Sequence, residues 1–81
     1  MSFHLKIPFD NKLLNVHFNK IASPSGKYFI DVNSDELIVA SFEMQRDHFN
    51  VWKITNAVPE WIVGLESQFA QEIIKNHFLE S

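Results

Sequence analysis

The chain contains no cysteine, which excludes a disulfide scaffold, a thiol nucleophile and a cysteine-based zinc site. A lack of cysteine is typical of a reducing compartment, so we expect a cytoplasmic protein. Glycine is nearly as scarce. Gly26 and Gly64 are the only two, which excludes glycine-rich phosphate loops and the Gly-x-Ser-x-Gly turn of hydrolases. We therefore expect no cofactor.

Long apolar runs and an excess of basic residues are also missing. The longest apolar run before residue 58 is Leu37-Ile38-Val39-Ala40, which is far too short to cross a bilayer. The N-terminal segment Met1–Lys6 has neither the basic start nor the apolar stretch of a signal peptide. The net charge of −3 argues against nucleic acid as a default partner. We expect neither nucleic acid nor membrane among its partners.

Aromatic side chains are abundant: the 81 residues include eight Phe, two Trp and one Tyr. A chain of this length forms one domain and buries only about two-thirds of its unfolded surface, so its core must be efficient. Each aromatic side chain can bury about 150–250 Å², which meets that need. We expect residues 1–81 to fold as a single domain.

Residues 58–78 have the length and the periodicity of a long helix. Apolar residues recur there at steps of three and four and share one stripe: Val58, Ile62, Leu65, Phe69 and Ile73, with Trp61 and Ala70 at its edges. Pro59 suits a first helical turn, because its missing N–H is not needed there. Gly64 points away from the stripe and costs about 1 kcal/mol in a helix. Either the helix bends at Gly64 or another backbone comes close to it.

The residues before this helix alternate between apolar and polar in short segments. We expect five strands, at about 3–9, 13–21, 27–32, 37–44 and 49–54. Strands that precede a single helix are typical of the α+β class. The sequence therefore predicts a five-stranded antiparallel β-meander with one C-terminal amphipathic helix packed across its inner face.

The first two strands have a predictable register. A two-residue turn at Asp10-Asn11 pairs Ile7 with Leu14, and it extends to pair Phe3 with Phe18. Both apolar rows then lie on one face, which supports this register. Further turns are predicted at Ser23–Gly26, Asn33–Glu36 and Gln45–His48.

The fourth and fifth strands are less regular. The inner row of the fourth strand is expected to contain Ile38, Ala40, Phe42 and Met44. The fifth strand has two possible phases, with either Trp52 and Ile54 or Phe49 and Val51 facing the core. We favour Trp52 and Ile54, because Lys53 then lies in the outer row.

Few groups of residues could carry chemistry. The expected register makes His4 and His17 neighbours on the outer face, with Asp31 beside His17. Two imidazoles and one carboxylate form a recognised metal-binding set. We favour a solvated polar face and expect no metal site, because an open sheet face supplies no groups that orient the ligands.

Other ionisable residues have simpler explanations. Arg46-Asp47-His48 fits turn chemistry. Glu66, at the edge of the helix stripe, is either a partly buried acid or a partner of lysine or water, and we favour the second. His77 suits the negative end of the helix dipole. No nucleophile stands beside a base, so we lean toward a protein that is not an enzyme.

The outer rows of the later strands suggest a surface for association. Five apolar residues are expected there: Phe29, Leu37, Val39, Phe49 and Val51. They alternate with the inner rows and cannot join the core unless a strand is bulged. A contiguous exposed apolar patch marks an interaction surface. The first hypothesis is therefore a non-enzymatic interaction module that forms a homodimer, or binds another protein, through this face.

The alternative hypothesis is a protein that binds a small ligand. A sheet that curls around a helix can leave an aromatic-lined pocket at an open end. The candidates for such a lining are Phe42, Trp52 and Trp61. A monomer whose melting temperature rises with a ligand favours this alternative, whereas a dimer without such a shift favours the first hypothesis.

Overall fold

Five antiparallel strands form one sheet in the order β1-β2-β3-β4-β5, and a helix in two pieces follows them. The computed structural model describes residues 2–21 and 26–80, without the side chains of 77–80. The strands are β1 (Ser2–Phe9), β2 (Lys12–Ile21), β3 (Lys27–Ser34), β4 (Leu37–Arg46) and β5 (Trp52–Ile54). The helical pieces are α1 (Glu60–Val63) and α2 (Glu66–Glu80).

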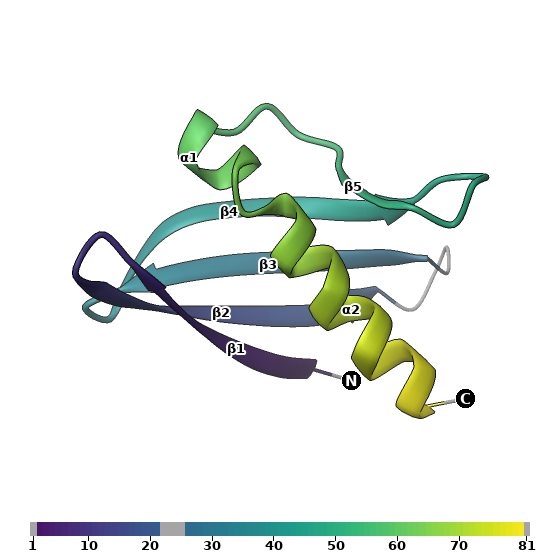
Figure 1. Cartoon of the computed structure of the whole chain (residues 1–81), viewed down its shortest axis with the longest axis horizontal. Helices are drawn as coiled ribbons and strands as arrows, with labels where there is room; N and C mark the ends of the chain where they lie inside the picture. Colours follow the sequence, from purple (N-terminus) through teal and green to yellow (C-terminus); the bar gives the residue numbers. More distant parts are fainter. Residues whose placement is uncertain (1, 22–25, 81) are drawn as a thin grey trace.

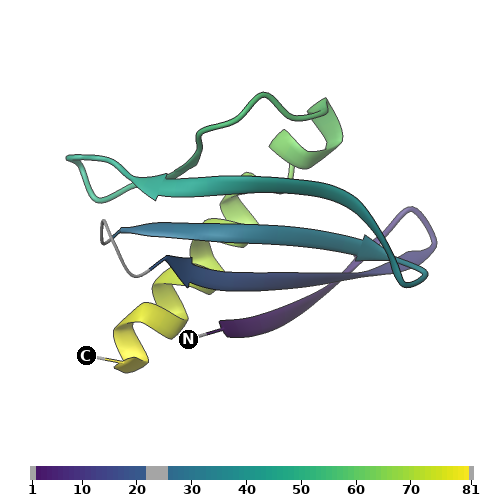
Figure 2. The ribbon, with the colours of Figure 1, turned by 180° about the vertical axis from the view of Figure 1, so that it is seen from behind.

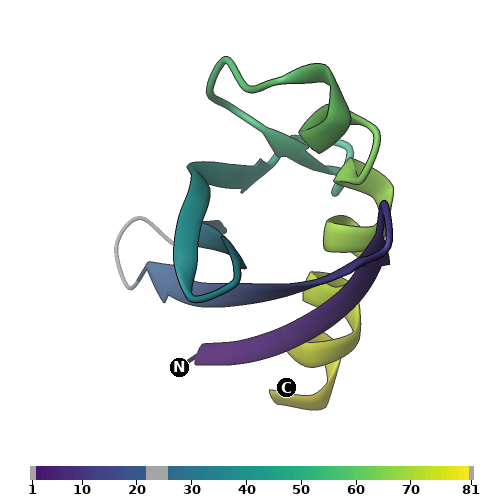
Figure 3. The same cartoon turned by 90° about the vertical axis from the view of Figure 1, so that its left-hand side faces the viewer.

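The sheet is curled and α2 crosses its inner face diagonally (Figure 1). The view along the sheet shows the strands curving toward the helix (Figure 3). No helix covers the opposite face within the described part of the chain (Figure 2). The prediction of an α+β meander with a C-terminal helix is confirmed. Among the described residues, no helix is both long enough and apolar enough to cross a membrane.

The core lies between α2 and the inner rows of the sheet. The predicted register of the first hairpin is confirmed, with Ile7 opposite Leu14 and Phe3 opposite Phe18. The fully buried Phe69 of α2 lies 5.6 Å from Phe42 and 6.3 Å from Phe18 between ring centroids. Offset and edge-to-face aromatic pairs at these separations add about 0.5–1.5 kcal/mol each to the gain from burial.

Two tight turns lie at the same end of the sheet. Asp10 and Asn11 join β1 to β2 with φ of 50° and 63°. Asp35 and Glu36 join β3 to β4 with φ of 52° and 68°, so this turn is shorter than the predicted Asn33–Glu36. Positive φ at both central residues defines the type I′ turn, whose twist matches that of a hairpin. The turn predicted at Ser23–Gly26 falls mostly on residues 22–25, outside the described residues.

β3 and β4 do not keep a continuous register. Val32 pairs with Ala40, but the next residue, Asn33, pairs with Ile38. Val39 is therefore the extra residue of a β-bulge, which bends β4 and redirects its side chains. The prediction that Ile38 faces the core is wrong. Ile38 lies opposite the outward Asn33 and is 62% exposed.

β5 is shorter than the predicted strand at 49–54, although its phase is as predicted. Trp52 is 3% exposed and Ile54 packs against the core. Phe49 lies outside the strand, because the Asp47 carboxylate accepts its N–H at 2.8 Å and that of Val51 at 3.0 Å. A carboxylate that accepts nearby backbone N–H groups stabilises a turn in place of strand pairing.

The predicted helix at 58–78 is broken at Gly64. The N–H of Leu65 donates to the carbonyl of Ile62, three residues back, and α2 begins at Glu66. A methyl group placed on Gly64 would meet only carbonyl oxygens of its own turn, at 3.6 and 3.7 Å. Of the two alternatives at Gly64, the bend is therefore observed and the close approach of another backbone is not.

Phe69→Ala should lower the free energy of unfolding by about 3–5 kcal/mol, because it removes a fully buried ring that two strands contact. Urea denaturation measures this loss. The matched control is Phe49→Ala, since Phe49 is 73% exposed and should cost only about 0.5 kcal/mol. Equal losses for the two variants would contradict the assigned core.

Candidate functional site

Three segments that are distant in sequence meet at one end of the sheet. They are the β1–β2 turn, the β3–β4 turn and α1, and Figure 1 places all three at the same end. Between them lies a cavity of about 380 Å³, open to solvent, which we name the end hollow. Its lining residues are Phe9, Asp10, Lys12, Leu14, Ser34, Val39 and Trp61.

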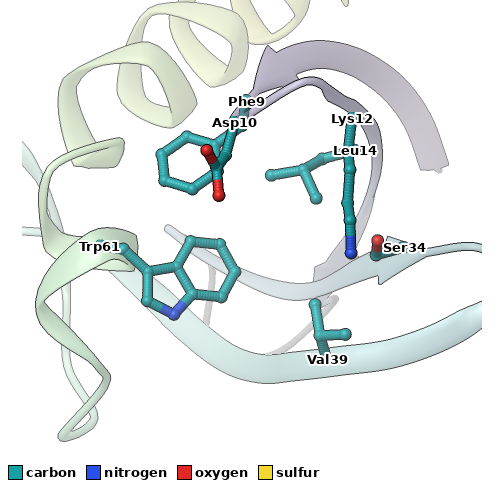
Figure 4. A pocket seen from close by; sticks show the side chains of 7 residues that line it. All are labelled: Phe9, Asp10, Lys12, Leu14, Ser34, Val39 and Trp61. Carbon is teal, nitrogen blue, oxygen red and sulfur yellow. The ribbon is translucent and has the colours of Figure 1, made fainter.

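The walls of the end hollow are largely apolar. The rings of Phe9 and Trp61 lie 5.3 Å apart between centroids and are tilted by 35°. Leu14 is 3% exposed and connects this space to the core. Figure 4 shows the side chain of Val39 rising from β4 toward Leu14 and Trp61. An aromatic pair and two aliphatic side chains thus surround a space that a small apolar group could fill.

Two irregularities of the backbone shape this lining. The bulge in β4 brings Val39 to the end hollow instead of leaving it in the outer patch predicted from alternation. The bend at Gly64 separates α1 from α2, and α1 carries Trp61 toward Phe9.

The polar lining residues stand at the rim. Asp10 and Lys12 are exposed, and Ser34 is half-buried. Among the described residues, these three side chains make no hydrogen bond or ion pair with one another. In Figure 4 the Lys12 side chain runs along the opposite side of the end hollow from Trp61. The rim therefore presents a carboxylate, an ammonium and a hydroxyl group to a molecule that enters.

Of the three aromatic residues predicted to line a pocket, only Trp61 does so. Phe42 and Trp52 are 2% and 3% exposed and belong to the core. Trp52 packs edge-on against Tyr28, with ring centroids 5.3 Å apart, and the Arg46 guanidinium lies 5.9 Å from its ring. Trp52 therefore packs within the core and does not line the end hollow.

The five residues predicted to form an outer patch are exposed but dispersed: Phe29, Leu37, Val39, Phe49 and Val51. Leu37 and Val39 lie at the turn end of the sheet, whereas Phe49 and Val51 lie in the β4–β5 loop at the other end. Phe29 pairs with Asn19 on one side and with Glu43 on the other. Across both neighbouring strands, Phe29 is thus flanked by polar side chains.

A polar row crosses the outer face where the metal-binding set was considered. His4 pairs with His17, and His17 pairs with Asp31, as predicted. The two imidazole rings are stacked, with centroids 4.3 Å apart and planes 18° apart. Their lone pairs lie in nearly parallel planes and cannot both reach one zinc ion at about 2.0–2.1 Å. Asp31 accepts the Ser41 hydroxyl at 2.7 Å, and the described residues contain no group of three ligands arranged to hold a metal.

The remaining candidates have structural roles. The turn role is confirmed for Asp47, which closes the β4–β5 loop with two accepted N–H groups. The turn predicted at Gln45–His48 begins too early, because Gln45 and Arg46 belong to β4 and pair with β5. The carboxylate of Glu66, in the first turn of α2, accepts the N–H of Ile54 at 2.9 Å. It therefore ties β5 to the helix, and within the described part of the chain it forms no ion pair with a lysine and does not line the end hollow. The side chain of His77 lies outside the described residues.

Six of the seven residues that line the end hollow were not predicted from the sequence to line a pocket: Phe9, Asp10, Lys12, Leu14, Ser34 and Val39. One signal was present. In a meander the first and third turns lie at the same end of the sheet. The turns at Asp10-Asn11 and Asp35-Glu36 were therefore expected at one end. No family model, curated protein or solved structure matches the chain.

The Asp47 carboxyl should titrate at a lower pH than an ordinary aspartate. The N–H of Val51 is the main cause of its lowered pKa, followed by the N–H of Phe49 and the charges of Lys53 and His48, while desolvation opposes them. A lowered pKa in the folded state stabilises the fold above the ordinary aspartate range, and this contribution is lost as the pH falls through the folded-state pKa.

NMR titration of the Asp47 carboxyl carbon measures this midpoint. In Asp47→Ala the amides of Phe49 and Val51 should lose their protection from exchange, because their acceptor is removed. Asp47→Asn is the control: it keeps one acceptor oxygen but has no charge to titrate. An ordinary midpoint for Asp47 would contradict the role of these hydrogen bonds.

Proposed function

We propose that this protein binds a small molecule with an apolar body in the end hollow, without catalysing a reaction. The observation that carries the proposal is the space itself, which Phe9, Leu14, Val39 and Trp61 surround but do not fill. A volume of about 380 Å³ lies within the range of known ligand sites, roughly 300–1,000 Å³. Aromatic and aliphatic walls with a few polar groups at the rim are typical of such sites.

The backbone around the end hollow supports this proposal. Four residues of its two turns have positive φ, as the type I′ geometry of both hairpins requires, and Glu36, at 68°, is of a type that rarely adopts this conformation. The bulge at Val39 adds a third irregular element beside the same space.

The polar rim favours binding over catalysis. A catalytic nucleophile needs a base within hydrogen-bonding distance, and that base needs an orienting group. Ser34 and Lys12 could serve as nucleophiles only beside such a base. Among the described residues, the one carboxylate of the rim, Asp10, contacts neither of them by a hydrogen bond or ion pair.

The neighbours Val39 and Ile38 provide a matched test of the end hollow. Both are exposed residues of β4, at 46% and 62%, but only Val39 lines the end hollow. Val39→Asp should weaken binding of the probe 2-phenylethanol about tenfold or more, because it places a charge against an apolar ligand. Ile38→Asp should leave the affinity unchanged.

NMR titration with 2-phenylethanol reports the binding directly, at a dissociation constant of about 1 mM for a ligand of this size. The indole N–H of Trp61 and the methyl groups of Val39 should shift. Shifts spread over the whole surface, or equal affinities for the two variants, would argue against the end hollow as the site.

A second candidate function is self-association, favoured by the unpaired part of β4. β5 pairs only with Met44–Arg46, so among the described strands the stretch from Leu37 to Phe42 has no neighbour on that side. Leu37 and Ile38 in this stretch are 69% and 62% exposed. An exposed apolar edge strand is a template for pairing with another chain.

Sedimentation at about 100 µM, well above a micromolar dissociation constant, should detect a dimer of this kind. Ile38→Asp should convert that dimer to a monomer with its secondary structure intact. Val63→Asp is the control, because Val63 is 52% exposed but lies on α1. A wild-type monomer at this concentration would remove the second candidate and leave the first untouched.

A further inference from the structure

The end hollow carries opposite charges at two fixed positions of its rim. Asp10 and Lys12 belong to the same hairpin, where Asp10 is the first turn residue and Lys12 pairs with Phe9. Among the described residues, neither side chain forms an ion pair. Each charge is therefore available to a ligand. The turn fixes the backbone positions from which the two side chains extend.

The two charges have different surroundings. Asp10 follows Phe9, whose ring pairs with Trp61, and aromatic faces attract cationic groups. A cation beside Asp10 thus meets a carboxylate and two rings. Lys12 and Ser34 both line the end hollow, and an ammonium with a hydroxyl group suits a carboxylate. Leu14 and Val39 add apolar side chains to the same lining.

We infer that the ligand is a zwitterion: a small molecule with an apolar body, a cationic group and an anionic group, as in an amino acid with an apolar side chain. Its cation faces Asp10 and the aromatic pair, and its anion faces Lys12 and Ser34. A ligand with one charge gains from one side of the rim and is repelled by the other. This inference rests on the proposed function of the end hollow.

Four probes with the same phenyl group separate these cases. Phenylalanine carries both charges, phenethylamine only the cation, 3-phenylpropanoate only the anion, and 2-phenylethanol neither. Each matched charge should tighten binding about threefold, the scale of an exposed ion pair, so phenylalanine should bind about tenfold more tightly than 2-phenylethanol. The difference should shrink in about 1 M salt, where charges are screened over about 3 Å.

Variants of the rim assign each charge. Asp10→Asn should remove the advantage that phenylalanine has over 3-phenylpropanoate, and Lys12→Gln its advantage over phenethylamine. Asn tolerates the positive φ of position 10. The controls are Asp35→Asn, which has the same backbone conformation in the other turn, and Lys6→Gln on the outer face, since neither residue lines the end hollow.

The outcomes are distinct. If all four probes bind equally and Val39→Asp weakens all of them, the zwitterion is wrong and the proposed function stands. A preference for one singly charged probe over phenylalanine also overturns the inference. If no probe shifts the resonances of Trp61 and Val39, the end hollow is not a binding site for this class, and the proposed function falls together with the inference.

Discussion

The packing of Phe69 against Phe18 and Phe42 is the contact on which the rest of the structure depends. The sheet has one apolar face and α2 has one apolar stripe, so their relative position is set where the largest side chains interlock. Once Phe69 lies between β2 and β4, the start of α2 is held near the edge of the sheet. α1 then extends to the end of the sheet, and Trp61 comes to face Phe9. The end hollow is thus a consequence of how the core is packed.

The regular parts of the fold could be predicted from alternation alone. Side chains in a strand change face at every residue, so a row such as Ile7, Leu5 and Phe3 fixes the register as soon as the turn is known. The helix stripe around Phe69 follows in the same way from a period of 3.6 residues. Both predictions rest on one periodic signal that nothing else in the chain contradicts.

The irregular parts had no such signal. Leu37-Ile38-Val39-Ala40 is a run of four apolar residues, and a run without polar residues carries no information about which member faces inward. The bulge at Val39 could therefore not be predicted, and Ile38 was wrongly assigned to the inner row, whereas Ala40, Phe42 and Met44 were assigned correctly. The predicted fifth strand was too long, because the N–H groups of Phe49 and Val51 donate to the Asp47 carboxylate instead of to a neighbouring strand. The end hollow was missed because its walls come from segments that meet only in three dimensions.

The hydrogen bond from the Ile54 N–H to Glu66 has a consequence for the end hollow. This hydrogen bond holds the end of β5 against α2. The burial of Leu65 holds the chain in place again just before α2 begins. Between these two anchors, residues 55–64 form a strap that carries Trp61 over the end of the sheet. The strap is also held between its ends, because Thr55 and Asn56 hydrogen-bond to Glu43 of β4 and Ile62 is fully buried in the core. The same packing that buries Ile62 therefore fixes Trp61, its chain neighbour, as a wall of the end hollow.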